Sequence, residues 1–432
     1  MASHEHFVPR GIDPNASGLS RRGVLTRGLV ALAGAASPAL LLGSRDADAK
    51  PRAVTGRQAA QAGAAQAKDS GVFETKGENA ILVDYESGTV LFEKNPDRQF
   101  PPASLAKMMT VAVLFNEIRE GRVKLEQDFL VSEHAWRTGG APSRTSCMFA
   151  PVNSRVKIVD LIQGIMIQSA NDGAIAVAEG IAGSEDAFAE LMNKRAKEIG
   201  LKSTSFGNPT GLPHFNNKAT ARDLYLLARH LIAEFPEFYK YYSQREFTYN
   251  NIRQFNRNPL LNDGIGADGL KTGYIKESGY NIVGSANQNG QRLIMVMSGC
   301  KSEKERAEEA RKLMDWGFRT FEQIKLYDKD EVVGEASVYG GASGRVPLVS
   351  EKTVNVLVPR GNRDKLKGRV VYSGPVKAPV EKGRPIGRLL VLRDDQVMQE
   401  TPLVAAGSVE IGTLRQRAFD AVGELLVGWI KG

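Results

Sequence analysis

The sequence contains few of the residues that build disulfide frameworks and metal centres. Its 432 residues include two cysteines, Cys147 and Cys300, and five histidines. There is no C-x-x-C pair and no histidine spacing typical of metal ligands, so the sequence predicts no metal site. A disulfide between the two cysteines and two separately buried thiols both stay open, because sequence alone does not give the distance between them.

The sequence also lacks any run of about 18 uncharged apolar residues, so it predicts no internal transmembrane helix. Its formal net charge is +8, but Lys and Arg are spread along the chain and form no dense basic run with interleaved aromatics. This distribution argues against nucleic-acid binding and favours attraction to anionic surfaces, either phospholipid or cell-wall polymer. A hydrophobic fraction of 42% and a charged fraction of 25% are typical of globular proteins.

The first 49 residues have the pattern of an export signal. Arg21-Arg22 precede an apolar segment over 28–43, and Ala47-Asp48-Ala49 is a small-x-small cleavage site. Paired arginines ahead of a mildly apolar segment are typical of twin-arginine signals. We therefore expect residues 1–49 to be removed on export, and a flexible leader over 50–71, rich in Ala, Gln, Gly and Lys, to follow.

Residues 72–324 show the element order of one α/β domain. The expected strands have β-branched or alternating apolar residues and glycine-bearing turns, and they lie at 79–84, 89–92, 269–274, 280–285 and 292–298. The expected helices have a 3.6-residue apolar period, and they lie at 104–118, 157–167, 173–181, 185–198, after Thr220-Ala-Arg-Asp223, and at 305–318. This order predicts a mixed sheet with a helical insert.

The character of the sequence changes after residue 324. Short β-like runs separated by Gly and Pro fill 325–412, which predicts a second, all-β domain. In 413–432 the apolar residues recur on one face of a helix: Phe419, Val422, Leu425, Leu426, Trp429 and Ile430. This amphipathic helix either packs on its own domain or lies in a membrane interface, and its terminal position favours the membrane.

Ser104 and Lys107 form the first part of a candidate catalytic site. They lie three residues apart at the expected start of a helix, directly after Pro101-Pro102, so the hydroxyl and the amine can meet on one face. A serine hydroxyl needs a neighbouring base to become a good nucleophile. A lysine, with an ordinary pKa of about 10.4, becomes that base only if burial or a nearby cation brings its pKa close to neutrality.

Two further patterns follow in the chain. Ser169 and Asn171 lie at the junction of two expected helices, where side chains can point into a cleft. Lys271-Thr272-Gly273 lies on an expected strand, where the glycine lets a substrate backbone approach closely. Each short pattern alone is weak, because S-x-x-K and S-x-N both recur elsewhere in this chain. The order of the three patterns and their contexts therefore carry the prediction.

In this order, S-x-x-K, S-x-N and K-T-G resemble the motifs of the D-alanyl-D-alanine carboxypeptidase family of low-molecular-mass penicillin-binding proteins. The resemblance covers about residues 72–432 and includes Asn208-Pro-Thr-Gly-Leu212, Thr220-Ala-Arg-Asp223, Gly279-Tyr-Asn281 and Trp316-Gly-Phe318. It implies an α/β domain of the penicillin-binding/β-lactamase-like type, followed by an all-β domain and a C-terminal amphipathic helix.

The resemblance also implies an activity and a location. The expected reaction is hydrolysis of the terminal D-alanine of peptidoglycan stem pentapeptides through an acyl-enzyme on Ser104, with β-lactam antibiotics as covalent inhibitors. No cofactor is implied, because serine and lysine suffice for acyl transfer. The expected location is the periplasm, where the terminal helix attaches the protein to the outer face of the cytoplasmic membrane.

Four residues have implied roles in the chemical steps. Ser104 attacks the carbonyl between the two terminal D-alanines, and Lys107 is the general base for that attack. Ser169 relays a proton to the leaving amine, while Asn171 orients Lys107 and the substrate amide.

The remaining implied roles concern binding. Lys271 and Thr272 bind the substrate carboxylate. The backbone N–H groups of the nucleophile and of Tyr274, next to Gly273, form an oxyanion hole. Arg306 resembles a family arginine near the carboxylate site, and an ordinary solvated helix residue stays open as the alternative.

Two other functions stay open beside the carboxypeptidase. A D,D-endopeptidase has the same motifs, although relatives with that activity usually lack the β-domain. A non-catalytic cell-wall-binding protein on this fold is expected to lose a catalytic side chain, and none is missing here. The appended β-domain argues against a β-lactamase, and the absence of G-x-S-x-G gives no support to a Ser-His-Asp hydrolase.

Overall fold

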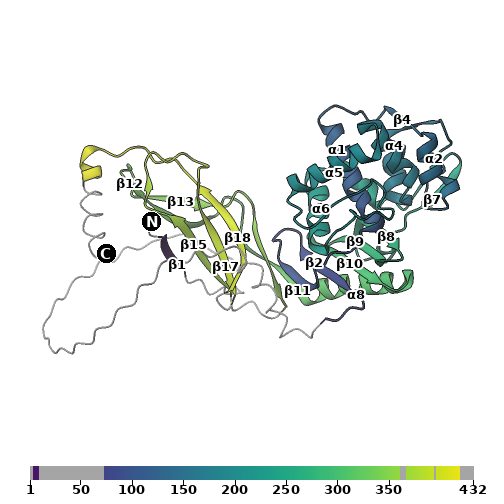
Figure 1. The fold of residues 1–432 in the computed structure, drawn as a ribbon. Coiled ribbons are helices and arrows are strands. Elements are labelled where there is room, and N and C mark those ends of the chain that lie inside the picture. Colours follow the sequence, from purple (N-terminus) through teal and green to yellow (C-terminus); the bar gives the residue numbers. More distant parts are fainter. Residues whose placement is uncertain (1–2, 9–72, 361–365, 394–395, 419–432) are drawn as a thin grey trace, which may run out of the picture.

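The chain folds into an α/β domain and a β-rich domain, joined where helix α8 (Glu303–Thr320) ends and strand β11 (Phe321–Tyr327) begins (Figure 1). The computed structural model describes residues 3–8, 73–360, 366–393 and 396–418. Of the predicted export signal, the structure describes only Ser3–Val8, and of the predicted terminal helix only its start, which is helical from residue 414. The predictions for the rest of 1–71 and for 419–432 lie outside the described residues.

A five-stranded sheet forms the centre of the α/β domain, in the order β3-β2-β10-β9-β8. Its strands are β2 (Asn79–Asp84), β3 (Val90–Lys94), β8 (Ala267–Ile275), β9 (Gly279–Gln288) and β10 (Gln291–Cys300), and all overlap strands expected from the sequence. The prediction of a mixed sheet is wrong for these five strands, because every neighbouring pair is antiparallel. Short hairpins join β2 to β3, β8 to β9 and β9 to β10, and short hairpins permit only antiparallel pairing. The fourth pair, β2 with β10, is antiparallel although no hairpin joins these two strands.

The two faces of this sheet bury different partners. Ile81 and Val83 pack into the core of the helical insert, whereas Ala80 and Leu82, which alternate with them, pack against α8 (Glu303–Thr320). This period of two is what a strand buried on both faces requires. The insert contains α1 (Lys107–Arg119), α2 (Glu133–Gly139), α3 (Ile158–Gln163), α4 (Asn171–Ala182), α5 (Glu185–Ile199), α6 (Ala221–Glu234) and α7 (Pro236–Tyr239).

Two of the expected helices differ from simple α-helices. The expected helix over 104–118 starts with a 3-10 turn at Ala103–Ala106, and α1 follows it. The expected helix over 157–167 begins as α3 and ends in a π-helical turn over Gly164–Gln168. Apolar periodicity does not distinguish these tighter and wider turns from an α-helix, and both adjoin candidate site residues.

Several short elements of the α/β domain have no clear sequence signal. They are helix α2 and the strand pairs β4 (Asp128–Leu130) with β5 (Arg155–Lys157) and β6 (Glu246–Tyr249) with β7 (Ile252–Phe255). Each strand has three or four residues, which is too short for an alternating pattern to stand out.

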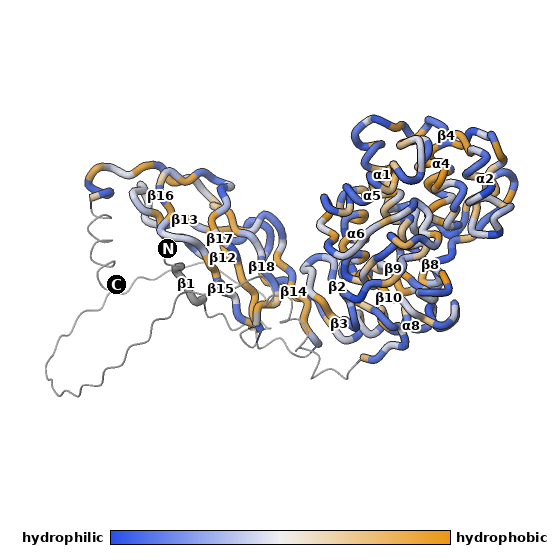
Figure 2. Tube along the Cα trace, viewed as in Figure 1, coloured by the Kyte–Doolittle hydropathy of each residue, from blue (hydrophilic) through white to orange (hydrophobic). Residues whose placement is uncertain are grey.

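The second domain is β-rich, as the sequence predicts, and has its own buried core. Strand β11 (Phe321–Tyr327) pairs with β14 (Val354–Pro359), so the boundary expected at 324/325 falls inside a strand. The larger sheet has the order β1-β15-β17-β18-β13-β12-β16. Its strands are β1 (Ser3–Val8), β12 (Val332–Tyr339), β13 (Arg345–Val349), β15 (Leu366–Ser373), β16 (Val376–Lys377), β17 (Pro385–Arg393) and β18 (Gln396–Ala405). Figure 2 shows hydrophobic residues recurring along the strands of both domains.

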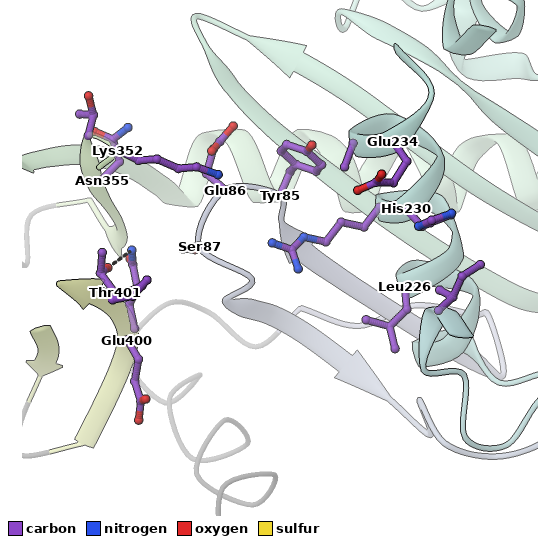
Figure 3. A pocket seen from close by; sticks show the side chains of 16 residues that line it. Tyr85, Glu86, Ser87, Leu226, His230, Glu234, Lys352, Asn355, Glu400 and Thr401 are labelled. Atoms are coloured by element: carbon purple, nitrogen blue, oxygen red, sulfur yellow. Dashed lines mark hydrogen bonds between the residues drawn. The ribbon is translucent and has the colours of Figure 1, made fainter. Parts of the chain in front are cut away.

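A polar cleft of about 550 Å³ lies between the two domains (Figure 3). The turn at Tyr85–Ser87 and helix α6 line one side, and residues 352–355 and 399–402 line the other. The hydroxyl of Thr89 donates a hydrogen bond of 3.5 Å across the boundary to the carbonyl of Met398. This cleft adjoins the β2–β3 turn, whereas β8 and its Lys271-Thr-Gly pattern form the opposite edge of the sheet.

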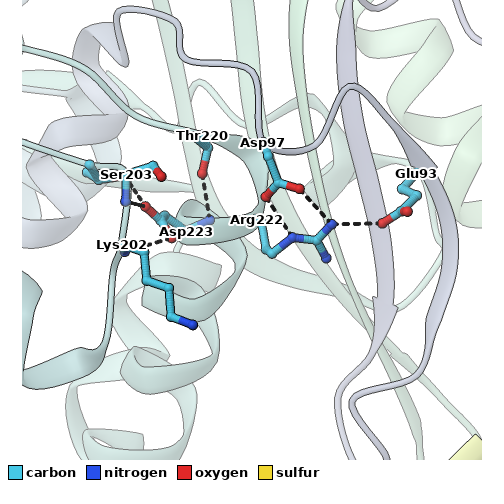
Figure 4. Close-up of polar contacts among 8 residues, drawn as sticks. Glu93, Asp97, Lys202, Ser203, Thr220, Arg222 and Asp223 are labelled. Carbon is cyan, nitrogen blue, oxygen red and sulfur yellow. Dashed lines mark hydrogen bonds and ion pairs between the residues drawn. The ribbon is translucent and has the colours of Figure 1, made fainter. Parts of the chain in front are cut away.

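The start of α6 shows how the Thr220–Asp223 pattern holds the domain together (Figure 4). Thr220 is the N-cap, and its side chain accepts a hydrogen bond from the backbone N–H of Asp223. The buried Asp223 carboxylate accepts from the N–H groups of Lys202 and Ser203 and from the hydroxyl of Thr204. Of the capping pair expected from sequence, the Thr220 side chain therefore caps the helix, whereas the Asp223 side chain binds the 202–204 loop.

We predict that Asp223→Ala destabilises the α/β domain by about 3 kcal/mol, because it removes a buried charged acceptor of three hydrogen bonds. Neighbouring Arg222 forms ion pairs with Asp97 and Glu93 that are partly open to solvent, so Arg222→Ala is expected to cost about 1 kcal/mol or less. Differential scanning calorimetry of both variants tests this difference. Equal losses of stability would contradict the structural role of Asp223.

Candidate active site

Ser104 and Lys107 meet as their spacing predicts. The 3-10 turn places the Ser104 hydroxyl 2.9 Å from Lys107 Nζ, and Nζ also donates a hydrogen bond of 2.6 Å to the carbonyl of Thr210. Lys107 is 1% exposed, whereas Ser104 is partly exposed. Ser104 is therefore in partial contact with solvent, while the Lys107 amine beside it is shielded from water.

The backbone around Ser104 is held by a close approach of two loops. Ala103, just before the serine, has a φ of 51°, which is uncommon for a residue with a side chain. A Cβ on Gly211 would lie 1.8 Å from the carbonyl oxygen of Ala103, and Gly211 itself has a φ of 75°. Only glycine fits there, which explains the glycine of the Asn208-Pro-Thr-Gly-Leu pattern. Within that loop, Asn208 Oδ1 accepts from the Gly211 N–H and the Thr210 hydroxyl.

Burial brings the pKa of Lys107 from its usual range down to about 7. The positive charge of Arg257 lowers this pKa further, and the negative charge of Asp172 opposes the change. Asp172 is fully buried and accepts hydrogen bonds from the N–H groups of Met148 and Ala150, so its carboxylate holds the loop beside the site. Near neutral pH, a large share of Lys107 is therefore uncharged and able to accept a proton.

Ser169 and Asn171 lie at the junction between the π-helical turn and α4. Ser169 has a φ of 66° at the end of the turn, and Asn171 is the first residue of α4. Both are buried, and Asn171 Nδ2 donates to the Thr145 hydroxyl at 2.9 Å. Ser169 Oγ and Asn171 Oδ1 have no hydrogen-bond partner among the described residues. Such buried polar atoms are costly unless a bound group satisfies them.

Strand β8 brings the third pattern against the turn that carries Ser104. A Cβ on Gly273 would lie 3.2 Å from the Ser104 backbone nitrogen and 3.1 Å from the Pro102 carbonyl oxygen, so the glycine permits this contact. Lys271 is buried, and its Nζ donates to the Thr272 carbonyl at 3.0 Å. Burial, together with the charges of Lys107, Arg257 and Arg306, lowers the pKa of Lys271 well below its usual value.

Thr272 and Tyr274 lie on the same strand as Lys271 and extend the site along its edge. Thr272 is buried, whereas Tyr274 is 54% exposed, and its ring lies 4.3 Å from that of Tyr280 on β9. Arg306 lies next to this pair, with its guanidinium 5.8 Å from the Tyr280 ring. At 5% exposure, Arg306 is a buried arginine and not the solvated helix residue that sequence left as an alternative.

Three features of the site could not be predicted from sequence patterns. Arg257 donates to the Ser146 hydroxyl at 2.6 Å and places a positive charge near Lys107 and Lys271, but it belongs to none of the recognised patterns. Thr145, the partner of Asn171, lies on an irregular loop. The Thr210 carbonyl is a backbone group inside a recognised pattern, so its bond to Lys107 depends on loop geometry.

The structure also reports on metals, membranes and cysteines. In the described parts of the chain, no group of three or more His, Cys, Asp or Glu residues is arranged to hold a metal ion. None of the described helices has the length and hydropathy needed to cross a membrane. Cys147 and Cys300 are both buried free thiols, and burial raises the pKa of Cys300 to about 12.

Comparison with known families matches both domains. Residues 62–302 match the model of the family described as D-alanyl-D-alanine carboxypeptidase, and residues 321–411 match the model described as penicillin-binding protein 5, C-terminal domain. The D-alanyl-D-alanine carboxypeptidase DacC of Escherichia coli is 39% identical over 345 residues, which are 79% of this chain and 86% of that protein.

Solved structures and more distant relatives agree with this match. The crystal structure of penicillin binding protein 5 from Haemophilus influenzae has a TM-score of 0.73 and 35% identity, covering 78% of this chain and 99% of that chain. A D-alanyl-D-alanine endopeptidase of Pseudomonas aeruginosa is 28% identical over 249 residues, only 55% of this chain. By its motifs, its two matched domains and its relatives, this chain belongs to the D-alanyl-D-alanine carboxypeptidase family of serine peptidases.

Proposed function

We propose that this serine-type D-alanyl-D-alanine carboxypeptidase removes the terminal D-alanine from peptidoglycan stem pentapeptides through an acyl-enzyme on Ser104. The observation that carries the proposal is the partly exposed Ser104 hydroxyl, 2.9 Å from a lysine amine whose pKa burial has brought to about 7. A nucleophile in contact with a base of matched pKa is the arrangement that acyl transfer at neutral pH requires.

In the proposed acylation step, Ser104 Oγ bonds to the carbonyl carbon between the two D-alanines as its proton passes to Lys107. The negative charge that develops on the carbonyl oxygen is stabilised by the N–H groups of Ser104 and Tyr274. The proton then moves from Lys107 through the Ser169 hydroxyl to the departing amine, and free D-alanine leaves. Water attacks the acyl-ester next, with Lys107 again accepting the proton, and Ser104 is regenerated.

The proposed position of the substrate follows from charge. The terminal carboxylate lies against Lys271, Thr272 and Arg306. Lys271 is buried and has no ion pair among the described residues, and Arg306 pairs with the exposed carboxylate of Glu303 at 3.3 Å. Asn171 presents an unpartnered Oδ1 to the substrate amide. A β-lactam carries a carboxylate beside a reactive amide, so it is expected to occupy the same positions and to acylate Ser104.

The retained β-domain favours the carboxypeptidase over an endopeptidase, because the matched endopeptidase aligns with 55% of the chain. D-Alanine release from a pentapeptide, compared with cleavage of a cross-linked stem dimer, separates the two activities. The non-catalytic alternative requires that neither substrate is cleaved.

We predict that Ser104→Ala removes both covalent labelling by benzylpenicillin and D-alanine release, because no acyl-ester can form. Mass spectrometry of the intact protein and an assay of free D-alanine measure the two effects. Ser154→Ala is the matched control, since Ser154 and Lys157 repeat the S-x-x-K pattern away from the site. An adduct that persists in Ser104→Ala would place the nucleophile elsewhere.

The acylation rate is predicted to rise with pH through about 7 and to level off above it, because only uncharged Lys107 accepts the serine proton. Arg257→Met removes a cation that lowers the Lys107 pKa, so the midpoint should move to higher pH. Arg257 is exposed to solvent, which screens its charge, so we expect a displacement of less than about one pH unit.

Ser146→Ala is the control for Arg257→Met, because it removes the hydrogen bond to Arg257 and leaves the positive charge in place. Rate constants for acylation by benzylpenicillin, measured across the neutral pH range, give both midpoints. A midpoint that moves to lower pH in Arg257→Met would contradict the electrostatic role of this residue.

We also propose that the protein is exported and attached to the outer face of the cytoplasmic membrane by the amphipathic helix over 413–432. The pattern of residues 1–49 supports export. The described chain ends at the side of the β-rich domain remote from the α/β domain, where Ile411 and Leu414 are 55% and 77% exposed. Attachment there would direct the active site away from the membrane (Figure 1).

Removal of residues 419–432 is predicted to release the mature protein from membranes and leave its soluble D-alanine release unchanged. The truncation keeps Gln416, whose side chain donates to the carbonyl of Ala342 and belongs to the β-rich domain. Replacing Asp420 and Glu424 on the polar face by Asn and Gln is the control and should leave the protein bound. Retention of the truncated protein on membranes, measured by sedimentation, would contradict the anchor.

A further inference from the structure

Next to the Ser104 turn lies a separate pocket of about 570 Å³, at the end of the sheet where β8 ends. Its walls are residues 98–101, the β8–β9 turn from Tyr274 to Tyr280, and residues 298–301 at the end of β10, with Glu78 and Asn79 from the start of β2. Its volume lies within the range of roughly 300–1,000 Å³ typical of ligand pockets. Pro101 and Tyr274 line this pocket, and their chain neighbours Pro102 and Gly273 approach each other at the Ser104 turn, so the two are contiguous.

The pocket carries positive charge that the protein does not neutralise. Arg98 pairs with Glu78 at 3.5 Å, but Lys276 and Lys301 are exposed and have no ion pair or hydrogen-bond partner in the described part of the chain. Glu277, next to Lys276, is the remaining acidic residue of the wall. One net positive charge is therefore left at the pocket, carried by two lysines that are free to bind an anionic group.

A buried polar atom on the wall also lacks a partner. Asn79 is 2% exposed, and its Nδ2 donates to the Ser298 hydroxyl at 2.8 Å. Asn79 Oδ1 has no hydrogen-bond partner among the described residues. An unpaired buried acceptor costs about 1–3 kcal/mol, so it favours a ligand that brings an N–H or O–H group.

The direction of β8 decides which half of a substrate reaches the pocket. With the terminal carboxylate at Lys271 and Thr272 and the reacting carbonyl at Ser104 and Tyr274, the rest of the peptide continues past Tyr274 toward Lys276. A strand rises about 3.3 Å per residue, so Lys276 lies about two peptide residues beyond Tyr274. The acyl half of the substrate is therefore the part that this pocket adjoins.

We infer that this pocket is a subsite for the acyl half of the stem peptide, and that Lys276 and Lys301 bind a carboxylate two to three residues before the scissile bond. This inference rests on the proposed function, because it takes the substrate's direction from the proposed roles of Lys271, Thr272 and Ser104. The subsite gives the enzyme a preference for stem peptides with a free carboxylate, which the residues of the S-x-x-K, S-x-N and K-T-G patterns do not supply.

The test compares two pentapeptides of equal length, L-Ala-γ-D-Glu-L-Lys-D-Ala-D-Ala and the same peptide with the free D-Glu carboxylate amidated. The wild type is expected to show a higher kcat/KM for the acidic peptide. The double variant Lys276→Gln/Lys301→Gln should lose about 3–10-fold in kcat/KM for that peptide, the range expected when exposed ion pairs are removed. Its kcat/KM for the amidated peptide should stay unchanged.

Two controls separate the pocket from other causes. Lys194→Gln/Lys197→Gln, on exposed positions of α5, removes the same charge elsewhere and should keep the preference for the acidic peptide. Nα,Nε-diacetyl-L-Lys-D-Ala-D-Ala has no D-Glu residue and therefore lacks the carboxylate that the subsite would bind, so every variant should cleave it like the wild type.

The outcomes distinguish this inference from the proposed function. If the wild type releases D-alanine from none of the three peptides, the proposed function itself fails. If it cleaves both pentapeptides and the pocket variant loses no preference, or the α5 variant loses as much, the subsite is refuted and the carboxypeptidase stands.

Discussion

The active site depends on one unfavourable burial, that of Lys107 beneath Ser104. A lysine with a pKa of about 7 in the folded protein and an ordinary value in the unfolded chain lowers stability. The penalty is on the order of 5 kcal/mol below pH 7, and it fades as the pH rises toward the ordinary lysine pKa, where both states lose the proton. The surrounding structure has to offset this penalty. Helix α1 is buried from Lys107 to Phe115, and the Thr210 carbonyl accepts a hydrogen bond from the amine.

The need to keep Lys107 buried also explains why glycine occupies two positions beside the Ser104 turn. The Ser104 turn is enclosed by the Asn208–Leu212 loop on one side and by β8 on the other, and both approaches are made at glycines, Gly211 and Gly273. A larger residue at either position would push a wall away and admit water to Lys107. Water around the amine would weaken the desolvation that lowers its pKa, so close packing and base strength are linked.

The sequence predicted the parts of the site that depend on local spacing. It did not predict the parts that depend on contacts between residues far apart in the chain. Ser104 and Lys107 share one turn, and Lys271-Thr-Gly lies on a strand with a clear apolar pattern, so both were predictable. Arg257, between β7 and β8, contacts Ser146, 111 residues away in the sequence, and its charge reaches Lys107, but no periodic pattern predicts such a contact. The mixed sheet was predicted wrongly, because hairpins fix three of its four strand pairs as antiparallel, and the direction of the fourth, β2 with β10, depends on a contact between distant segments.

The cluster of cations has a consequence for the timing of the proposed reaction. Lys107, Lys271, Arg257 and Arg306 lie near one another. Burial first, and the charge of Arg257 second, lower the pKa of Lys107, while the charges of Lys107, Arg257 and Arg306 lower that of Lys271. A substrate carboxylate bound at Lys271 and Arg306 brings negative charge into this cluster and therefore raises the pKa of Lys107. The base thus becomes stronger once the substrate is in place, which is when it has to take the proton from Ser104. Lys107 passes that proton through Ser169 to the departing amine. Departure of D-alanine then removes the carboxylate, so the pKa of Lys107 falls again and the amine is uncharged when water attacks the acyl-ester.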